Sequence, residues 1–271
     1  MTMNFKDMLI HIDDSSQCEN RLELAINLAK THGAHLTGLY VITHPHYAPQ
    51  HEVKRQEAIA AEEKFRQVTG NADVPADWIL ADWGIVGVEM SEIINHYAHQ
   101  KDLIIVGQTG SNKPKGDVPA DLPERIVFGS GRPVLIVPYA GKFTTVGTRS
   151  IVAWRGGRAS ARAVNDSLPF LINSEKIYVL SIKTSGDRQH SVIPGGEICT
   201  HLARYGLTCT AEDIVSTDIP VANILMNFAW DKGCDLLVVG VYAQTSGRKM
   251  KLGPVARQLL DDMTLPVLMS H

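Results

Sequence analysis

The feature that most constrains the fold of this chain is an internal repeat. The segment Asp102-Leu-Ile-Ile-Val-Gly107 recurs as Asp235-Leu-Leu-Val-Val-Gly240, and residues 133–137 recur at the same offset as 266–270, both beginning Pro-Val-Leu. Self-similarity at a fixed spacing indicates a duplicated structural unit, and 271 residues suit two ordinary domains. We therefore expect two copies of one unit, at 1–140 and 148–271, joined by a linker at 141–147.

Both copies alternate short apolar runs with longer amphipathic stretches. Near-continuous apolar runs separated by helices are typical of a parallel sheet that helices cover on both faces. The pattern predicts an α/β fold with two tandem doubly wound domains, each a five-stranded parallel sheet flanked by helices. The first copy carries extra length, which we place at 43–60. The expected strands are 8–12, 35–42, 76–81, 102–106 and 133–137, then 150–154, 176–182, 208–214, 235–239 and 266–269; the expected helices of the first copy are 18–32, 51–69, 86–99 and 121–129.

The composition excludes several classes of function. The formal net charge is -3, whereas a nucleic-acid-binding surface needs a basic excess or patch. The sequence starts without an apolar segment behind a basic stretch, and no apolar run approaches the ~20 residues of a membrane span. We therefore expect a soluble, cytoplasmic protein with neither a nucleic-acid nor a membrane partner. The four cysteines match no zinc or disulfide framework, so we expect reduced thiols at Cys18, Cys199, Cys209 and Cys234.

A doubly wound sheet places its ligand crevice beyond the carboxyl ends of the strands. The loops after the first, second and fourth strands of each copy should converge there. In the first copy they bring Ile12, Asp13, Val41 and the Gly107-Gln-Thr-Gly110 loop. In the second copy they bring Arg155, the stretch from Ser181, and the stretch from Gly240 to Gly253.

These loops carry a resemblance to the universal stress protein family in its tandem bacterial form. Asp13 stands where the family ends its first strand with Asp, and Gly107 and Gly110 match the first two glycines of its phosphate loop. The second copy has Gly240 and Ala243 at those two positions. The resemblance implies an adenine nucleotide alpha hydrolase-like fold with strand order 3-2-1-4-5, ATP or AMP bound in one half, a homodimer and a role in stress survival.

Both copies depart from the family pattern. Where the family has Gly-Ser, the first copy has Ala120-Asp121 and the second has Gly253-Pro254. We expect Asp121 to cap the following helix, while its carboxylate repels a phosphate by ~2–4 kcal/mol at an effective dielectric near 20. Pro254 suits a first helical turn but removes a hydroxyl and an N–H donor. Arg155 puts a donor where the family has an Asp acceptor.

Two alternatives stay open at these crevices. Asp13 is either a ligand contact or a turn residue that hydrogen-bonds its own backbone. The stretch Ser246-Gly-Arg-Lys-Met-Lys251, which contains Arg248, is either a solvated loop or an anion clamp that leads into Gly253, Pro254 and Val255 at a helix start.

The histidines suggest a weaker candidate site. His44, His46 and His51 lie close in sequence, and imidazoles are common metal ligands. A metal site needs several converging ligands, and no carboxylate or cysteine follows at a regular spacing, so we expect an exposed polar loop rather than a metal site. We expect His11, within the first strand, to be a core or crevice histidine.

The residues contain no hydrolytic motif such as Gly-x-Ser-x-Gly or a Walker loop. We therefore expect a non-enzymatic stress-response binding or sensor protein with degenerate nucleotide sites, taking a nucleotide or another small anion. The alternative is a weak ATPase or nucleotide hydrolase, and we expect no catalytic residue and no metal.

Overall fold

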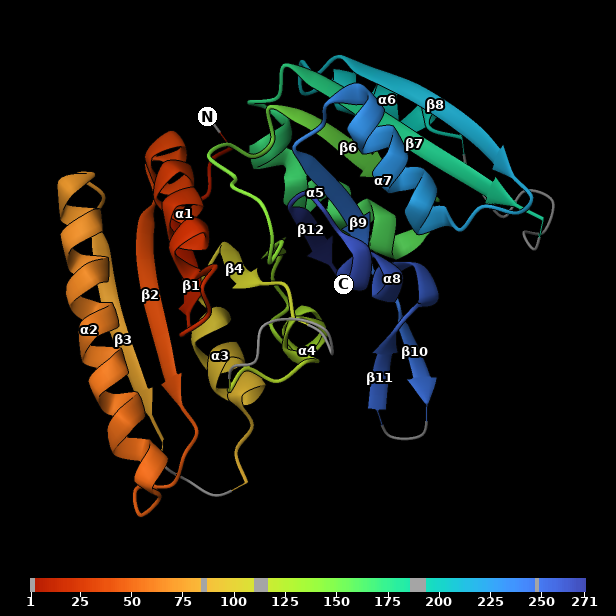
Figure 1. The fold of residues 1–271 in the computed structure, drawn as a ribbon. Helices are drawn as coiled ribbons and strands as arrows, with labels where there is room; N and C mark the ends of the chain where they lie inside the picture. The colour runs from red at the N-terminus through yellow and green to blue at the C-terminus, as the bar shows by residue number, and fades with distance from the viewer. Residues whose placement is uncertain (1–2, 84–86, 110–116, 186–193, 247–248) are drawn as a thin grey trace. The chain divides into compact units, whose positions relative to one another are not determined.

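The computed structural model describes residues 3–83, 87–109, 117–185, 194–246 and 249–271 (Figure 1). The chain forms two compact units, one of residues Asn4–Thr144 and the other of Thr145–His271 with Met3. Within the described residues, no helix combines the length and the apolar composition that a bilayer crossing requires.

The first unit is a parallel α/β unit with strand order β3-β2-β1-β4-β5, which confirms the predicted order 3-2-1-4-5. Helix α1 packs against β1 and β4, and α2 packs against β2 and β3. Its elements are β1 (Asp7–Ile12), α1 (Cys18–His32), β2 (His35–Ile42), α2 (Pro49–Asn71), β3 (Ala76–Asp82), α3 (Met90–Ala98), β4 (Leu103–Gly107), α4 (Leu122–Gly129) and β5 (Val134–Val137).

The second unit repeats this arrangement with the order β8-β7-β6-β9-β12, again parallel. Its elements are β6 (Arg149–Ala153), α5 (Gly157–Leu171), β7 (Lys176–Thr184), α6 (Gly196–Ala203), β8 (Cys209–Ser216), α7 (Val221–Lys232), β9 (Leu236–Gly240), β10 (Ala243–Ser246), β11 (Lys249–Leu252), α8 (Pro254–Asp262) and β12 (Val267–Ser270).

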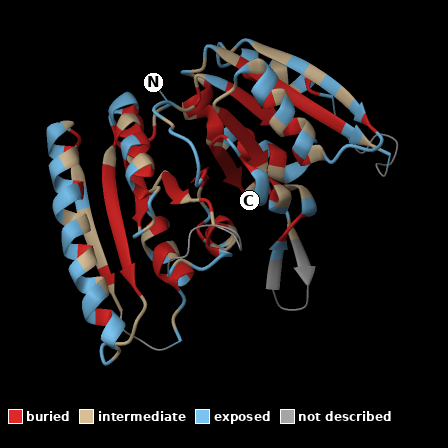
Figure 2. Cartoon of the chain, viewed as in Figure 1, coloured by how far each residue is buried: buried red, intermediate tan, exposed pale blue. Residues whose placement is uncertain are grey.

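The central strands form the cores of both units. Leu103 to Val106 of β4 and Leu236 to Val238 of β9 are fully buried, as the near-continuous apolar runs predict (Figure 2). The outer strand β8 alternates between half-buried and exposed side chains, as expected for a strand with one covered face. These buried strands fix the positions of the loops that follow them.

The two units differ in two places. Helix α2 of the first unit has 23 residues, whereas α6 of the second has 8, so the extra length expected at 43–60 includes the first turns of α2. The second unit adds an antiparallel hairpin, in which Ala243 pairs with Leu252 and Ser246 with Lys249. The basic stretch 246–251, left open between a solvated loop and an anion clamp, has its described residues in this hairpin: Ser246 ends β10, and 249–251 belong to β11.

Candidate functional site

The carboxyl ends of β1 and β2 in the first unit bring three predicted site residues together. Ile12, Asp13 and Val41 line one small cavity of about 20 Å³. Ligand pockets usually measure about 300–1,000 Å³. The volume of this cavity lies far below that range.

Asp13 is held by residues of its own unit. Its Oδ2 accepts a hydrogen bond of 2.7 Å from Nη2 of Arg21 on α1, and its Oδ1 accepts a 3.0 Å bond from the backbone N–H of Ser15. Burial opposes the charged carboxylate, but Arg21, His11 and Ser15 together hold the pKa of Asp13 below its ordinary value. Of the two readings left open above, the contacts match a turn residue.

Arg21 is a residue that the sequence reasoning missed. Its side chain is buried, and Nε and Nη2 donate to the carbonyl oxygen of His11 at 3.2 and 3.1 Å. A Cβ on Gly107 would lie 2.3 Å from Arg21 Nη1. The guanidinium therefore occupies the space beside Gly107 between the ends of β1 and β4. The sequence signal that could have revealed it is an arginine among the regularly spaced apolar residues of the helix expected at 18–32.

A second basic side chain crosses the same crevice. Lys54 of α2 lies in an ion-pair cluster, with its Nζ 2.6 Å from Asp14, 2.8 Å from Glu57 and 2.8 Å from Asp117. Burial opposes its charge, but hydrogen bonds to Asp117, Asp14 and Glu57 raise the pKa of Lys54 above its ordinary value. The extra helical length of the first unit thus supplies a cation that neutralises its own carboxylates.

The other predicted residues of the first unit lie elsewhere. Asp121 precedes α4 at the N-cap position, but its side chain makes no capping hydrogen bond, so the expected cap is wrong. Its Oδ2 instead accepts a 2.6 Å hydrogen bond from Nε of Arg125, one turn along the helix, and Arg125 also pairs with Glu89. Asp121 lines a separate cavity with Thr43. Gly110 lies outside the described residues.

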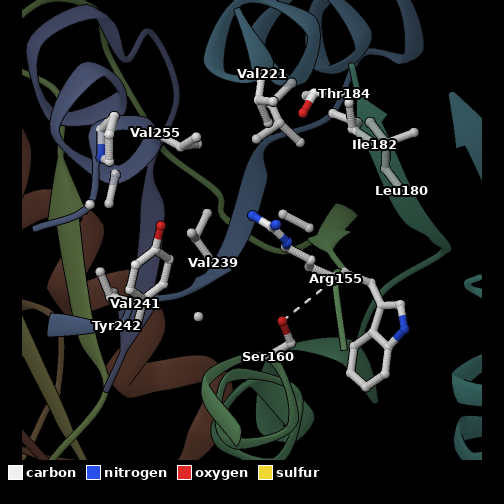
Figure 3. A pocket seen from close by; sticks show the side chains of 17 residues that line it. Arg155, Ser160, Leu180, Ile182, Thr184, Val221, Val239, Val241, Tyr242 and Val255 are labelled. Atoms are coloured by element: carbon white, nitrogen blue, oxygen red, sulfur yellow. Dashed lines mark hydrogen bonds between the residues drawn. The ribbon is translucent and has the colours of Figure 1, made fainter. Parts of the chain in front are cut away.

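The second unit contains a much larger cavity, of about 310 Å³, at the corresponding strand ends (Figure 3). The carboxyl ends of β6, β7 and β9 and the starts of α7 and α8 form its wall. This is the crevice position expected of a doubly wound sheet. The lining residues are Ala153, Trp154, Arg155, Ser160, Leu180, Ile182, Thr184, Val221, Leu225, Val239, Gly240, Val241, Tyr242, Gly253, Pro254, Val255 and Ala256.

The cavity combines apolar walls with a few polar groups. Val221, Val239 and Val255 project into the space around Arg155 in the close-up view (Figure 3). The exposed Arg155 supplies the guanidinium of the lining, and its backbone N–H donates to Oγ of Ser160 at 3.4 Å. This mixture suits a flat apolar group with an anionic end.

The two predicted glycines of this unit have different neighbours. A Cβ on Gly240 would lie 2.3 Å from the backbone carbonyl of Ala159, so Gly240 permits α5 to approach the end of β9. A Cβ on Gly253 would lie 3.0 Å from the Tyr242 ring. Gly253 is the N-cap of α8 and Pro254 follows in its first turn, as the sequence predicts.

Of the predicted second-unit residues, Arg155, Gly240, Gly253, Pro254 and Val255 all line this one cavity. Arg248 lies outside the described residues.

The histidine cluster of the first unit also departs from expectation. His51 lies in the first turn of α2 and is buried, so the expected exposed loop is wrong for this residue. Its Nε2 is 2.9 Å from Oδ1 of Asp82 at the end of β3. His11 is buried as expected, with Nδ1 3.8 Å from Asp13.

Comparisons with known proteins agree with this fold. The model of the universal stress protein family matches residues 4–138. The chain belongs to the universal stress protein family, in its tandem form. No curated protein matches the sequence.

The structural comparisons cover both units. A universal stress protein from Archaeoglobus fulgidus DSM 4304 superposes with a TM-score of 0.73 at 16% identity, over 97% of each chain. A protein of unknown function from Pseudomonas aeruginosa PAO1 superposes with a TM-score of 0.60 at 16% identity, over 98% of this chain and 92% of the other. These similarities extend the shared fold over almost the whole chain.

Proposed function

We propose that this chain is a non-enzymatic stress-response binding protein whose nucleotide site lies in the second unit. The observation that carries the proposal is that five predicted site residues of the second unit line one cavity of about 310 Å³. In the first unit, Asp13 and Asp121 line two separate cavities, of about 20 and 280 Å³. The family resemblance supplies the ligand class, an adenine nucleotide.

The residues of the second cavity fit such a ligand in two parts. The valine and leucine side chains suit the faces of an adenine ring. The start of α8 offers backbone N–H donors and a partial positive charge, and Arg155 adds a full charge. Pro254 removes one N–H, and the volume is near the lower limit for such pockets, so AMP fits better than ATP.

The first unit is proposed to be degenerate as a nucleotide site. Arg21 occupies the position beside Gly107, and Lys54 is engaged by three carboxylates. A nucleotide would have to displace the buried Arg21–Asp13 pair, which leaves an unpaired charge and is costly. The intramolecular pairs therefore take the place of a ligand.

The chemistry of the second cavity favours binding over hydrolysis. Its polar lining side chains are the guanidinium of Arg155, the hydroxyls of Ser160, Thr184 and Tyr242, and the indole of Trp154. Among the described lining residues there is no carboxylate or imidazole to act as a general base. A weak ATPase is the alternative function, and phosphate release from ATP distinguishes the two.

The proposal is tested with the purified full chain. Acid extraction and mass spectrometry should identify co-purified AMP or ATP, and calorimetry should give a tighter Kd for AMP than for ATP-Mg. Arg155→Ala and Val255→Trp should each weaken AMP binding at least tenfold. Two controls should bind as the wild type does: Arg162→Ala, whose exposed side chain pairs with Asp166, and Asp121→Ser in the first unit.

Three results would count against the proposal. Unchanged affinity in both Arg155→Ala and Val255→Trp would place the nucleotide elsewhere. A change of affinity in Asp121→Ser, in either direction, would place it in the first unit, because this substitution removes the carboxylate that would repel a phosphate there. Steady phosphate release from ATP that Arg155→Ala abolishes would make the protein an enzyme.

The proposed setting is the cytoplasm, and the proposed assembly is a homodimer, both as the family resemblance implies. Sedimentation at several protein concentrations tests the assembly, and a constant monomer mass would exclude the dimer.

A further inference from the structure

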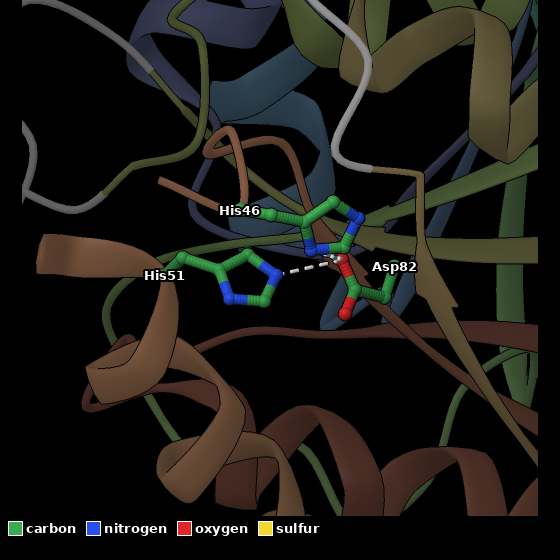
Figure 4. Close-up of side chains that lie close together, drawn as sticks. All are labelled: His46, His51 and Asp82. Carbon is green, nitrogen blue, oxygen red and sulfur yellow. Dashed lines mark hydrogen bonds and ion pairs between the residues drawn. The ribbon is translucent and has the colours of Figure 1, made fainter. Parts of the chain in front are cut away.

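Three potential metal ligands meet at the end of β3 in the first unit (Figure 4). They are His46, from the segment between β2 and α2, His51, from the first turn of α2, and Asp82, the last residue of β3. One ligand atom from each lies within 4.8 Å of the other two. Nothing in the proposed nucleotide function uses these residues.

The distances suit a single small cation. His51 Nε2 is 2.9 Å and His46 Nδ1 is 3.9 Å from Oδ1 of Asp82. Two ligands at the ~2.0–2.1 Å bond lengths of zinc, in tetrahedral geometry, stand about 3.4 Å apart. The two distances to Asp82 each differ from this value by roughly half an ångström, and the exposed side chain of His46 has room to move.

Backbone hydrogen bonds and strand register bring the three side chains together. Ala48 N–H donates to the carbonyl of Pro45 at 2.8 Å, and His51 N–H donates to the carbonyl of Ala48 at 2.9 Å. These turns bring the two imidazole rings to a centroid separation of 4.5 Å, edge to face. The β2–β3 register, with Ile42 beside Asp82, sets the carboxylate at the same edge.

Charge also favours a cation at this place. The ion pairs of Asp82 that the described residues form are with the two histidines, and no lysine or arginine joins them. A carboxylate with two neutral imidazoles carries one negative charge, and the carboxylate is only partly exposed. Two imidazoles and a carboxylate are a borderline donor set that suits zinc.

We propose that His46, His51 and Asp82 form a Zn²⁺ site in the first unit. His51 and Asp82 supply the buried side of the coordination shell, and His46 closes it from the exposed side. The fourth position faces solvent and takes water. The bound ion ties the start of α2 to the end of β3.

Metal titration of the EDTA-treated full chain tests the site. Co²⁺ serves as the spectroscopic probe, and Zn²⁺ affinity follows from displacement of Co²⁺. The wild type should bind one equivalent with the visible absorption of low-coordinate cobalt. His46→Ala, His51→Ala and Asp82→Asn should each weaken binding at least tenfold, because each removes a ligand.

His44→Ala is the matched control, since it lies two residues from His46 outside the cluster. It should bind within twofold of the wild type. His46→Ala decides the question if the buried variants misfold, because the His46 side chain is largely exposed. Zn²⁺ should raise the Tm of the wild type and of His44→Ala but not of His46→Ala. No binding by the wild type, or equal affinity in His46→Ala and the wild type, would overturn the proposal.

Discussion

Asp13 and Arg21 form a buried ion pair at the end of β1, with 2.7 Å between Asp13 Oδ2 and Arg21 Nη2. The same guanidinium binds the carbonyl of His11 and lies against Gly107. The first unit thus uses the family's strand-end carboxylate and first loop glycine to accommodate a side chain of its own. The Arg21 side chain therefore fills the space beside Gly107 at the ends of β1 and β4.

Removing the arginine should destabilise the first unit strongly. Arg21→Met leaves Asp13 as a buried unpaired carboxylate, a change that costs about 3–5 kcal/mol. Urea unfolding measures the loss. Arg66→Met is the control, because Arg66 pairs with Glu62 on an exposed face of α2, and such pairs contribute only about 0.3–0.5 kcal/mol. A loss below about 1 kcal/mol in Arg21→Met would contradict the structural role of the pair.

The double variant checks the physical cause. Adding Asp13→Asn to Arg21→Met removes the stranded charge, so the double variant should be more stable than Arg21→Met alone. Equal stability of the two proteins would mean that Arg21 acts through packing rather than charge.

The two glycines of the second crevice should respond differently to an added methyl group. In Gly240→Ala the new Cβ would meet backbone atoms of Ala159 at 2.3 Å, which cannot move without displacing α5. Overpacking of this kind costs about 1–3 kcal/mol or more. In Gly253→Ala the Cβ would meet the half-exposed Tyr242 ring at 3.0 Å, which can turn aside, so the loss should stay below about 1 kcal/mol. Urea unfolding of the two variants measures the loss in free energy of unfolding, and equal losses in both would contradict this prediction.

The sequence predicts the fold well because the signals that specify it are local. The apolar run at 35–42 became β2 with the same bounds, and the amphipathic stretch at 18–32 became α1. The hairpin β10–β11 escaped prediction, because a glycine among basic residues is equally compatible with a loop or a turn.

The candidate sites were harder to predict because they depend on long-range contacts. In the sequence, Arg21 is one charged residue on an expected helix. Only the packing of α1 against β1 and β4 brings its side chain to Asp13 and Gly107. Asp82 joins His51 across 31 residues, a spacing that no local motif encodes. Asp121 had the right position for a cap, but Arg125 one turn later competes for its carboxylate.

The cysteines should react slowly in the folded protein. Burial, together with the neighbouring Cys199, raises the pKa of the Cys209 thiol to about 12, and burial raises that of Cys234 to about 11. Only the thiolate reacts, so at pH 8 its fraction falls about a thousandfold at Cys209 and about a hundredfold at Cys234 relative to an ordinary thiol. Ellman's reagent should therefore modify the thiols of Cys209 and Cys234 quickly only after the protein unfolds. Rapid modification of either in the native protein, located by mass spectrometry, would contradict the prediction.

Acid should destabilise the first unit between pH 6.5 and pH 4. Burial, aided by the charge of Arg21 for His11 and of Lys6 for His32, lowers the pKa of both histidines from 6.5 to about 4. Between these values the unfolded chain binds protons that the folded chain does not, so the free energy of unfolding falls as the pH falls. Each histidine adds a slope of up to about 1.4 kcal/mol per pH unit.

Urea midpoints at several pH values, in EDTA to exclude bound metal, measure this dependence of the free energy of unfolding on pH. His32→Gln should reduce the slope by about one proton, whereas the half-exposed control His44→Gln should keep it. A pH-independent midpoint in the wild type, or the same slope in His32→Gln as in the wild type, would show that the buried imidazoles are not the groups that titrate.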